Sequence, residues 1–473
     1  QTPPPIPFQV PPGFEVVRIA APPLVKFPVM GNFDDRGRLF VAENAGVNAS
    51  DKVLDETTPN HVRLLEDTDG DGVFDRATVF ADKMTFPQGA LWHQGGLYVA
   101  SPPGIWRLED TDGDGKADVR KQLVKGFKYT GNAADVHGPF LHPNGRIYWC
   151  HGRKGHEVFQ ADGTLAAKGL AARIWSMRPD GTDIQVHASG GMDNPAEVTF
   201  SQEGDIFGTV NIFHRGPRAD AILHWVHGAA HPHNETAIAE LKRTGPLLGA
   251  TALIGHVAPA GVTLLRHDAW PPEYRGNVFW AEFNTRRIMR TVLEPAGATF
   301  RGRGEVFATT TADGAHFTDV FEDADGSLVV IDTGAWFRQG CPSSGVARPE
   351  ILGGIYRVRR TGTKPTDDPR GLRIDWARLP SARMIDLFAD ARPAVRDRAL
   401  AELAGQGSVA PLAAALGDHR YLVRSNAVWA LTRIGTADAA AAARRALADA
   451  DPRVRQAACQ SAFFSIDREA FAA

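Results

Sequence analysis

Five side chains in the N-terminal two thirds of the chain have the chemistry of acid–base catalysis. A histidine can take a proton near neutral pH, a carboxyl group can donate or accept one, and an arginine can neutralise a developing negative charge. The candidates for catalysis are His137, His151, Arg153, Glu197 and Asp319. This combination suits β-elimination from a uronic-acid polysaccharide, with the arginine neutralising the substrate carboxylate.

A second group of residues could bind a substrate or a cofactor next to these candidates. Its members are Gln88, Asn194, His214, Arg215, Glu282, Arg286, Trp336 and Arg338. His214 and Arg215 begin an insertion that also contains His224, His227, His231 and His233. Several histidines with carboxylates could bind a divalent metal at this place. A solvated loop is the alternative for the insertion.

Two further segments, 67–72 and 110–115, share the string Asp-Thr-Asp-Gly-Asp-Gly. Aspartates at alternate positions of a tight turn resemble the start of a calcium loop. The candidate metal ligands are Asp67, Asp69, Asp71, Asp110, Asp112 and Asp114. Position 12 of each loop is not Glu, which argues against an EF-hand. Structural calcium and a plain polar hairpin turn both stay open.

The elements that must position these residues are marked by six glycines. Each glycine closes a short β-forming run and precedes a polar residue and two hydrophobic ones, except that Gly96 lacks the polar residue. The markers are Gly37, Gly96, Gly145, Gly204, Gly276 and Gly326. A repeat of about 50 residues built on a turn between two strands is typical of a β-propeller. We therefore predict a six-bladed β-propeller over residues 1–360.

The markers also predict which residues share one face of the propeller. The starts of the inner strands and the ends of the second strands should open on the same mouth of the channel. The inner-strand starts are Met30, Gln88, His137, Ala196 with Glu197, Ala260, and Thr318 with Asp319. Polar groups that converge there from hydrophobic strands indicate a ligand pocket. The two acidic loops should lie on the opposite face.

Composition changes after residue 360, where glycine and proline give way to an alanine-rich region with helical spacing. We predict a linker at 361–380 and helices at 381–473. Val-Arg pairs that end in Arg396, Arg424 and Arg455 recur there, and the pattern resembles HEAT repeats. These arginines could form a binding stripe or be structural partners within repeats. The predicted fold class is an all-β six-bladed β-propeller followed by a small α-helical HEAT-like repeat domain.

Charge and cysteine content narrow the function classes. A net charge of −3 favours neither nucleic acid nor an anionic membrane as a partner. No apolar run is long enough to predict a transmembrane segment. Cys150, Cys341 and Cys459 have no metal-binding or haem-attachment spacing. Because the chain begins with Gln1 rather than methionine, we expect a periplasmic or secreted protein, with a trimmed chain as the alternative.

These features together resemble the glucose/sorbosone dehydrogenase family. The resemblance rests on the six blades, on the Gly-Arg-Ile-Tyr marker at 145–148, and on residues 257–262 followed by 271–276. Residues 11–16, the acidic loops and the HEAT-like repeats are similar to its large exported branch, the membrane-bound dehydrogenases of planctomycete-type bacteria. The resemblance covers nearly the whole chain.

This resemblance implies sugar oxidation with pyrroloquinoline quinone and with His137 as the general base. The family's Arg-Asn-Pro-x-Gly pattern is replaced at 193–197 by Asp-Asn-Pro-Ala-Glu, and the arginine-rich start of the last blade by 316–320. Because a tricarboxylate quinone needs cationic partners, these losses weaken the case for it. The arginines that could compensate are Arg153, Arg215, Arg286, Arg287 and Arg338.

We expect an exported protein that acts on a carbohydrate at the propeller mouth. The leading hypothesis is a sugar dehydrogenase-like oxidoreductase with His137 as general base. Because the chain carries no haem motif, its electrons would pass to a separate acceptor protein. One alternative is a quinone-free polysaccharide lyase or hydrolase that uses the same residues. The other is a non-enzymatic carbohydrate-binding or scaffold protein.

Overall fold

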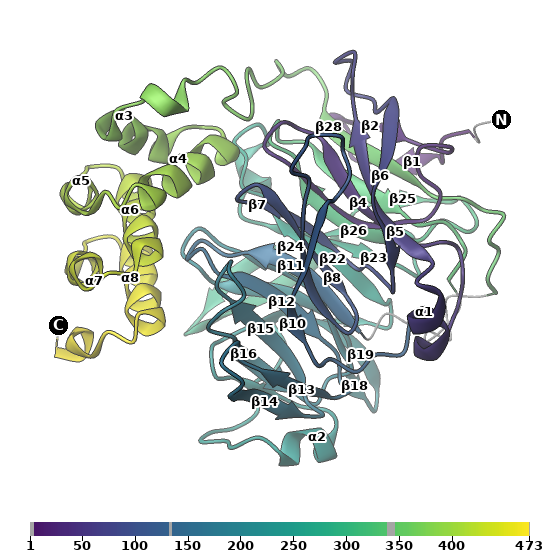
Figure 1. Ribbon diagram of the computed structural model, residues 1–473, viewed down its shortest axis with the longest axis horizontal. Helices are drawn as coiled ribbons and strands as arrows, with labels where there is room; N and C mark the ends of the chain where they lie inside the picture. Colours follow the sequence, from purple (N-terminus) through teal and green to yellow (C-terminus); the bar gives the residue numbers. More distant parts are fainter. Residues whose placement is uncertain (1–3, 132–134, 338–345, 473) are drawn as a thin grey trace.

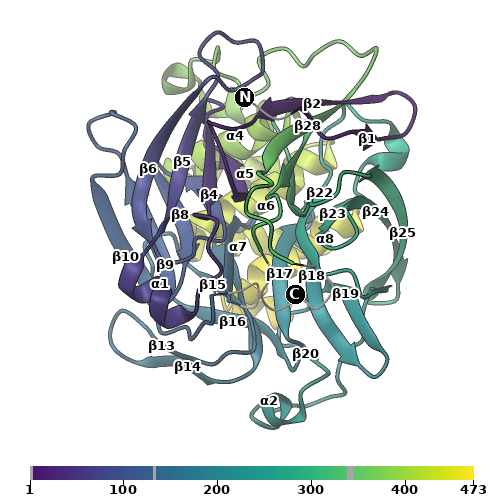
Figure 2. The same cartoon turned by 90° about the vertical axis from the view of Figure 1, so that its right-hand side faces the viewer.

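Six β-sheets surround a central channel in the computed structural model, which describes residues 4–131, 135–337 and 346–472 (Figure 2). Each sheet is one blade. The innermost strands of neighbouring blades contact one another in cyclic order, so the ring is closed. The predicted all-β six-bladed propeller, followed by a helical region, is confirmed.

The first three blades follow the chain from the inner strand outward, and blade 3 gains a short parallel strand, β20, at its outer edge. Blade 1 contains β3 (Pro28–Phe33), β4 (Leu39–Glu43), β5 (Asn60–Glu66) and β6 (Arg76–Met84). Blade 2 contains β7 (Ala90–His93), β8 (Gly96–Ser101), β9 (Gly104–Glu109) and β10 (Val119–Lys125). Blade 3 contains β11 (Val136–Leu141), β12 (Ile147–His151), β15 (Ala172–Met177), β16 (Gln185–Gly190) and β20 (Ala230–His231). A hairpin of β13 (His156–Phe159) and β14 (Leu165–Gly169) projects from it.

The last two blades take strands from both ends of the propeller segment. Blade 4 contains β17 (Asn194–Phe200), β18 (Ile206–Arg215), β19 (Arg218–His224) and β21 (Ala252–Gly255). Blade 5 contains β22 (Pro259–Leu264), β23 (Val278–Glu282), β24 (Arg287–Ala296), β25 (Thr299–Thr310) and β1 (Phe8–Gln9). Blade 6 contains β26 (Phe317–Glu322), β27 (Leu328–Asp332), β28 (Gly354–Arg360) and β2 (Phe14–Ala20). Because β2 pairs with β28, the N-terminal strand closes the ring by backbone hydrogen bonds.

The marker glycines lie in the turns between the two innermost strands of the blades. Five of the six have a positive φ, between +70° and +93°, which glycine adopts without steric cost. In blade 2 the turn glycine is Gly95, with φ of +74°, and Gly96 is the first residue of β8. Gly96 therefore takes the place of the polar residue, which is why this repeat lacked one in the sequence.

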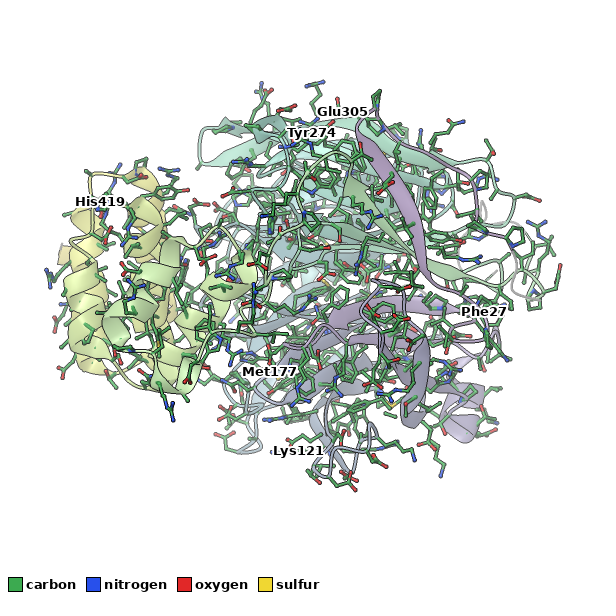
Figure 3. All side chains as sticks on the ribbon, turned by 90° about the horizontal axis from the view of Figure 1, so that it is seen from above. Phe27, Lys121, Met177, Tyr274, Glu305 and His419 are labelled. Atoms are coloured by element: carbon green, nitrogen blue, oxygen red, sulfur yellow. The ribbon has the colours of Figure 1, made fainter. Side chains whose placement is uncertain are left out.

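The C-terminal region is a stack of short helices, hereafter the helical module, beside one end of the propeller (Figures 1 and 3). None of the helices in the described part of the chain has the length and apolar character needed to span a membrane. The helices are η2 (Trp376–Arg378), α3 (Ser381–Asp386), η3 (Leu387–Ala389), α4 (Pro393–Gly405), α5 (Val409–Ala415), α6 (Tyr421–Ile434), α7 (Ala437–Arg444), η4 (Arg445–Ala448), α8 (Pro452–Phe464) and η5 (Arg468–Ala472). The propeller carries only α1 (Asp51–Thr57), α2 (Glu235–Ala239) and η1 (Pro272–Tyr274) among the described residues.

The three repeated arginines of the helical module have structural partners within the repeats. Nη1 of Arg396 donates to the carbonyl oxygen of Asp390, at 2.7 Å. Arg424 and Arg455 make the equivalent bond six residues back, at 2.9 and 2.7 Å. These bonds hold the turn before each helix, so the arginines do not form a free binding stripe.

The helical module is attached to the marker-turn end of the propeller. Nε1 of Trp429, which is fully buried, donates to the carbonyl oxygen of Gln202 at 2.9 Å. Nε of Arg433 donates to the carbonyl oxygen of Pro143 at 2.9 Å, and Arg266 forms an ion pair with Asp397 at 2.7 Å. These contacts leave the helical module away from the opposite end of the channel, where the inner strands begin.

A pair of glycine substitutions tests this attachment. A Cβ at Gly204 would lie 2.8 Å from the Trp429 ring, whereas a Cβ at Gly276 would have nothing within 4 Å. Both residues have a positive φ, so Gly276→Ala should lower the free energy of unfolding by about 1 kcal/mol through backbone strain alone. Gly204→Ala should lower the free energy of unfolding by at least about 2 kcal/mol, because the Trp429 ring must also move. Urea unfolding measures both, and equal losses would contradict the attachment of α6 at this turn.

Candidate functional site

A cavity of about 200 Å³ occupies the mouth of the channel where the inner strands begin; it is called here the mouth cavity. The residues predicted at the inner-strand starts line it: Met30, Gln88, His137, Ala196 with Glu197, Ala260 and Thr318. Three of the predicted second-strand ends also line it, namely Asn211, Phe283 and Thr333. All six blades therefore contribute to one site.

Irregular pairing at the start of the inner strands helps to direct these side chains. The register between the inner and second strands shifts in five blades, between Pro28 and Met30, His137 and Phe140, Pro195 and Glu197, Pro259 and Val262, and Phe317 and Asp319. Such bulges release a residue from the strict alternation of a strand and turn its side chain toward a site.

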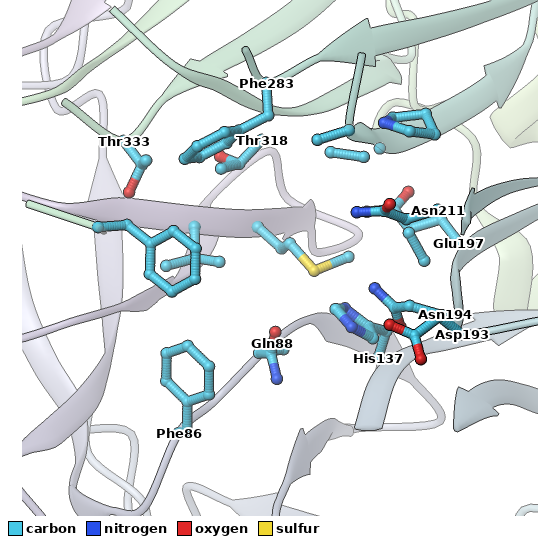
Figure 4. A pocket seen from close by; sticks show the side chains of 18 of the residues that line it. Phe86, Gln88, His137, Asp193, Asn194, Glu197, Asn211, Phe283, Thr318 and Thr333 are labelled. Carbon is cyan, nitrogen blue, oxygen red and sulfur yellow. The ribbon is translucent and has the colours of Figure 1, made fainter. Parts of the chain in front are cut away.

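Three buried polar atoms that line the mouth cavity have no protein partner. Within the described part of the chain, Nε2 of Gln88, Oδ1 of Asn211 and Oγ1 of Thr318 are buried and make no hydrogen bond to the protein. His137, which is 7% exposed, lies beside Asn194 and Asp193 (Figure 4). A buried polar atom left unpaired costs about 1–3 kcal/mol, so the cavity is suited to a ligand with hydroxyl groups.

Glu197 is a buried acid with a raised pKa at this site. Its Oε2 accepts a hydrogen bond from the backbone N–H of Val262 at 2.9 Å, and its Oε1 has no partner in the described part of the chain. Burial raises the pKa of Glu197 well above its ordinary value, and the neighbouring carboxylate of Asp319 raises the pKa further. Both effects favour the protonated form, which can donate a proton.

Asp319 does not line the mouth cavity, which corrects the prediction for this residue. Its Oδ2 accepts a hydrogen bond from the backbone N–H of Gly31, at 3.0 Å, so it links blade 6 to blade 1. Burial raises its pKa as well. The residue lines a second cavity of about 970 Å³, which lies between the marker-turn end of the propeller and the helical module. Met30 and Glu197 line both cavities and so stand between them.

Two of the predicted catalytic residues have structural partners instead. His151 is fully buried, its Nε2 lies 3.0 Å from the carbonyl oxygen of Lys128, and burial lowers its pKa to about 4. Nη2 of Arg153 forms an ion pair with Asp193 at 2.7 Å. Neither residue lines the mouth cavity, whereas Asp193 and Lys154 do, although the sequence analysis did not propose them as site residues.

Some of the predicted binding residues line the mouth cavity and others do not. Gln88, Asn194 and Trp336 line the mouth cavity. His214 packs on Phe213, Glu282 pairs with Arg287 at 2.5 Å, and Arg286 lies 3.8 Å from Asp313, so these three are turned elsewhere. Arg215 ends β18, but its side chain lies outside the described residues, as does the whole of Arg338.

The histidine-rich insertion does not gather at the mouth. His224 contacts Asp205 at 3.3 Å, and His227 packs against Phe463 of the helical module with ring centres 4.1 Å apart. Among the described residues, only two groups of three possible metal ligands come close enough to share an ion, and both lie in the acidic loops. The predicted divalent metal at the mouth therefore has no ligand set in the described part of the chain.

The acidic loops join β5 to β6 and β9 to β10, so they lie at the marker-turn end as predicted. In the first loop Asp67, Asp69 and Asp71 come together. In the second loop Asp110 and Asp112 are joined by Asp118 rather than by the predicted Asp114. Asp67 also accepts hydrogen bonds from two backbone N–H groups of its own turn, at 2.8 and 2.9 Å. These bonds fit the polar-turn interpretation, and structural calcium stays a prediction.

Aromatic residues also line the mouth cavity, and the sequence analysis proposed only Trp336 among them as a site residue. Phe86, Phe283, Trp336 and Phe337 line it, and each is less than a tenth exposed. Phe86 precedes the inner strand β7, and the other three follow the second strands β23 and β27. Large aromatic residues in a predicted loop beside an inner strand were the signal that could have identified them.

The comparisons with known proteins agree with this architecture. Solved structures of sugar dehydrogenase-like six-bladed propellers have the same fold. An oxidoreductase (glucose dehydrogenase) of Thermus thermophilus is 17% identical over 73% of this chain and 100% of that one, with a TM-score of 0.52. The holo form of the pyranose dehydrogenase PQQ domain of Coprinopsis cinerea is 13% identical over 76% of this chain and 98% of that one, with a TM-score of 0.50. At such identities the likeness shows the fold alone.

The chain belongs to the family described as domain of unknown function (DUF7133), whose model matches residues 6–339. Residues 381–462 match HEAT repeats, which confirms the resemblance seen in that region. A comparison with curated proteins gives no match.

The described residues do not fit pyrroloquinoline quinone, whose three carboxylates need cationic partners. Lys154 is the one cationic side chain that lines the mouth cavity among those described, and it stands with the carboxyl groups of Asp193 and Glu197. Arg153 and Arg287, which could have compensated, are paired with Asp193 and Glu282. An anionic cofactor would therefore meet acids where it needs bases.

Replacement of Glu197 by glutamine tests whether the acid is neutral. A folded-state pKa above the ordinary 4.5 means that the stabilising effect is complete below that value and is lost as the pH rises through the folded-state pKa. Glutamine resembles the protonated acid and does not titrate. We expect Glu197→Gln to raise the melting temperature at about pH 8 by more than at about pH 5. A difference that stays constant across this range would show that Glu197 is ionised in the folded protein.

Proposed function

We propose that this chain acts on a carbohydrate in the mouth cavity by acid–base chemistry without a quinone, as a lyase or hydrolase. His137 is the general base and Glu197 is the proton donor. The proposal is carried by one observation: a buried carboxyl group with a raised pKa and an uncommitted oxygen lines the same cavity as a histidine. A carboxyl group with a raised pKa can act as the acid, and a histidine can act as the base.

The substrate class follows from the other polar groups. The amides of Gln88 and Asn211 and the hydroxyl of Thr318 offer neutral donors and acceptors that complement sugar hydroxyls. The ammonium of Lys154 can pair with a substrate carboxylate, as a uronic acid would require. These groups support a carbohydrate rather than a strongly anionic ligand, because two carboxyl groups share the cavity with this one lysine.

In the lyase reaction, His137 takes the proton from the carbon next to the substrate carboxyl group. The electron pair of that C–H bond forms the new double bond, and the C–O bond to the leaving sugar breaks. Glu197 gives its proton to the leaving oxygen, so the charge stays balanced within the cavity. In the hydrolase reaction the base takes the proton of a water molecule instead.

A second candidate function is an exported sugar dehydrogenase-like oxidoreductase that passes its electrons to a separate acceptor protein. The fold shared with sugar dehydrogenases and the position of His137 at an inner-strand start support it. It needs a bound oxidant, and the acidic lining of the mouth cavity counts against a quinone.

Replacement of His137 tests the proposed base. We expect His137→Ala to lower turnover by about 100-fold or more, because general base catalysis contributes at least that much. The purified protein is incubated with uronate polymers and neutral glycosides, and unsaturated products and new reducing ends are measured. The matched control is His419→Ala, in the helical module and far from the cavity (Figure 3), which should retain full activity.

Quinone titration and dye reduction separate the two candidates. If the protein is a lyase or hydrolase, the quinone absorbance does not change when pyrroloquinoline quinone is added, and no sugar leads to dye reduction. Quinone binding with sugar-dependent dye reduction would replace the proposal by the dehydrogenase. Full turnover by a folded His137→Ala variant would remove His137 from either mechanism.

A further inference from the structure

The mouth cavity has two unlike halves. The polar half contains His137, Asn194, Glu197 and Asn211, and Gln88 and Thr318 lie nearer to Phe86 and Phe283 (Figure 4). The other half contains four aromatic rings, hereafter the aromatic wall: Phe86, Phe283, Trp336 and Phe337. In Figure 4, Glu197, Asn194, Asn211 and His137 gather on one side, and Phe86 lies on the other. A ligand that fills this cavity must therefore carry one polar end and one apolar end.

The aromatic wall is continuous and rigid. The ring of Phe86 lies 6.3 Å from that of Trp336 at 82°, and Trp336 lies 5.3 Å from Phe337 at 69°. Phe337 in turn meets Phe283 edge to face at 5.8 Å. Nε1 of Trp336 donates to Oγ1 of Thr333 at 2.8 Å, which fixes the orientation of the indole. Edge-to-face contacts of this kind add stability beyond the area that they bury.

The aromatic wall belongs to a hydrophobic cluster at the channel mouth, which also contains Phe27, Met30 and Tyr129. Most of the other hydrophobic clusters fill the space between neighbouring blades or within the helical module. The four rings are less than a tenth exposed and line the mouth cavity, so a ligand that fills the cavity would contact them.

A sugar ring by itself does not match these rings. A pyranose presents an apolar C–H face to one aromatic ring, but its hydroxyl groups would lose water without gaining partners against four of them. A flat apolar substituent on the sugar avoids this loss, because it needs no hydrogen bond. The four rings offer such a group apolar contacts beside the sugar.

We infer that the substrate is a glycoside with an aromatic or similarly flat apolar aglycone. Its sugar lies against the polar half, next to His137 and Glu197, and its aglycone lies against the aromatic wall. This inference rests on the proposed function, because it assumes that the polar half binds the sugar. It adds that the apolar half selects the group attached to that sugar.

Matched pairs of glycosides test the inference. Phenyl and methyl glycosides of glucose, xylose and glucuronic acid are titrated into the wild-type protein by calorimetry, with phenol and a disaccharide as references. We expect the phenyl glycoside of at least one sugar to bind about tenfold tighter than its methyl counterpart, as burial of one ring predicts. The Phe86→Ala variant should bring this ratio close to one. The control Phe159→Ala, whose ring is 48% exposed on β13, should leave the ratio unchanged.

The outcomes separate this inference from the proposed function. Equal binding of phenyl and methyl glycosides overturns the inference and leaves the carbohydrate site in place. A disaccharide that binds as tightly as the phenyl glycoside also overturns it, because the wall would then stack a second sugar. Phenol that binds as tightly as the phenyl glycoside shows that the sugar contributes nothing, which overturns it too. If no glycoside binds at all, the proposed function itself fails.

Discussion

Buried carboxyl groups tie the inner strands of this propeller together. Inner strands of neighbouring blades belong to different sheets, so side-chain hydrogen bonds contribute to the contact between them. Glu197 accepts a hydrogen bond from the backbone of Val262 in the next blade, and Asp319 does the same for Gly31. Glu322 accepts one from His267, at 2.7 Å. These links fix the positions of four of the inner strands relative to one another, and the shape of the mouth cavity depends on those positions.

The same carboxyl groups limit the chemistry of the channel. Glu197 uses one oxygen for the blade contact and has the other left for a ligand, while burial raises its pKa. Asp319 lines the second cavity and links blade 6 to blade 1. A mouth cavity with two carboxyl groups and, among the described residues, one cationic side chain suits neutral or singly charged ligands. The fold of a quinone-dependent sugar dehydrogenase is thus combined with a mouth of different charge.

The architecture could be predicted from the sequence because it follows from local chemistry. Glycines with positive φ mark the turns, and their spacing gave six blades and the residues at the mouth, including His137 and Glu197. What failed depends on the direction of a side chain after a bulge or at a strand end. His151 turns inward to a carbonyl oxygen, and Arg153 turns to an acid. Strand β2 closes blade 6, and the aromatic wall is assembled from several loops. Both features join segments far apart in the sequence, so they could not be predicted from a repeat pattern.

A crystal structure of the protein with a bound phenyl glycoside tests the account most directly. The account predicts electron density for the sugar in the mouth cavity, with hydroxyl groups on Gln88 and Asn211 and one edge facing His137. The aglycone ring is predicted against Phe86 and Trp336. A sugar found in the cavity beside the helical module, or with its ring reversed so that the hydroxyl groups meet the aromatic wall, would contradict the account.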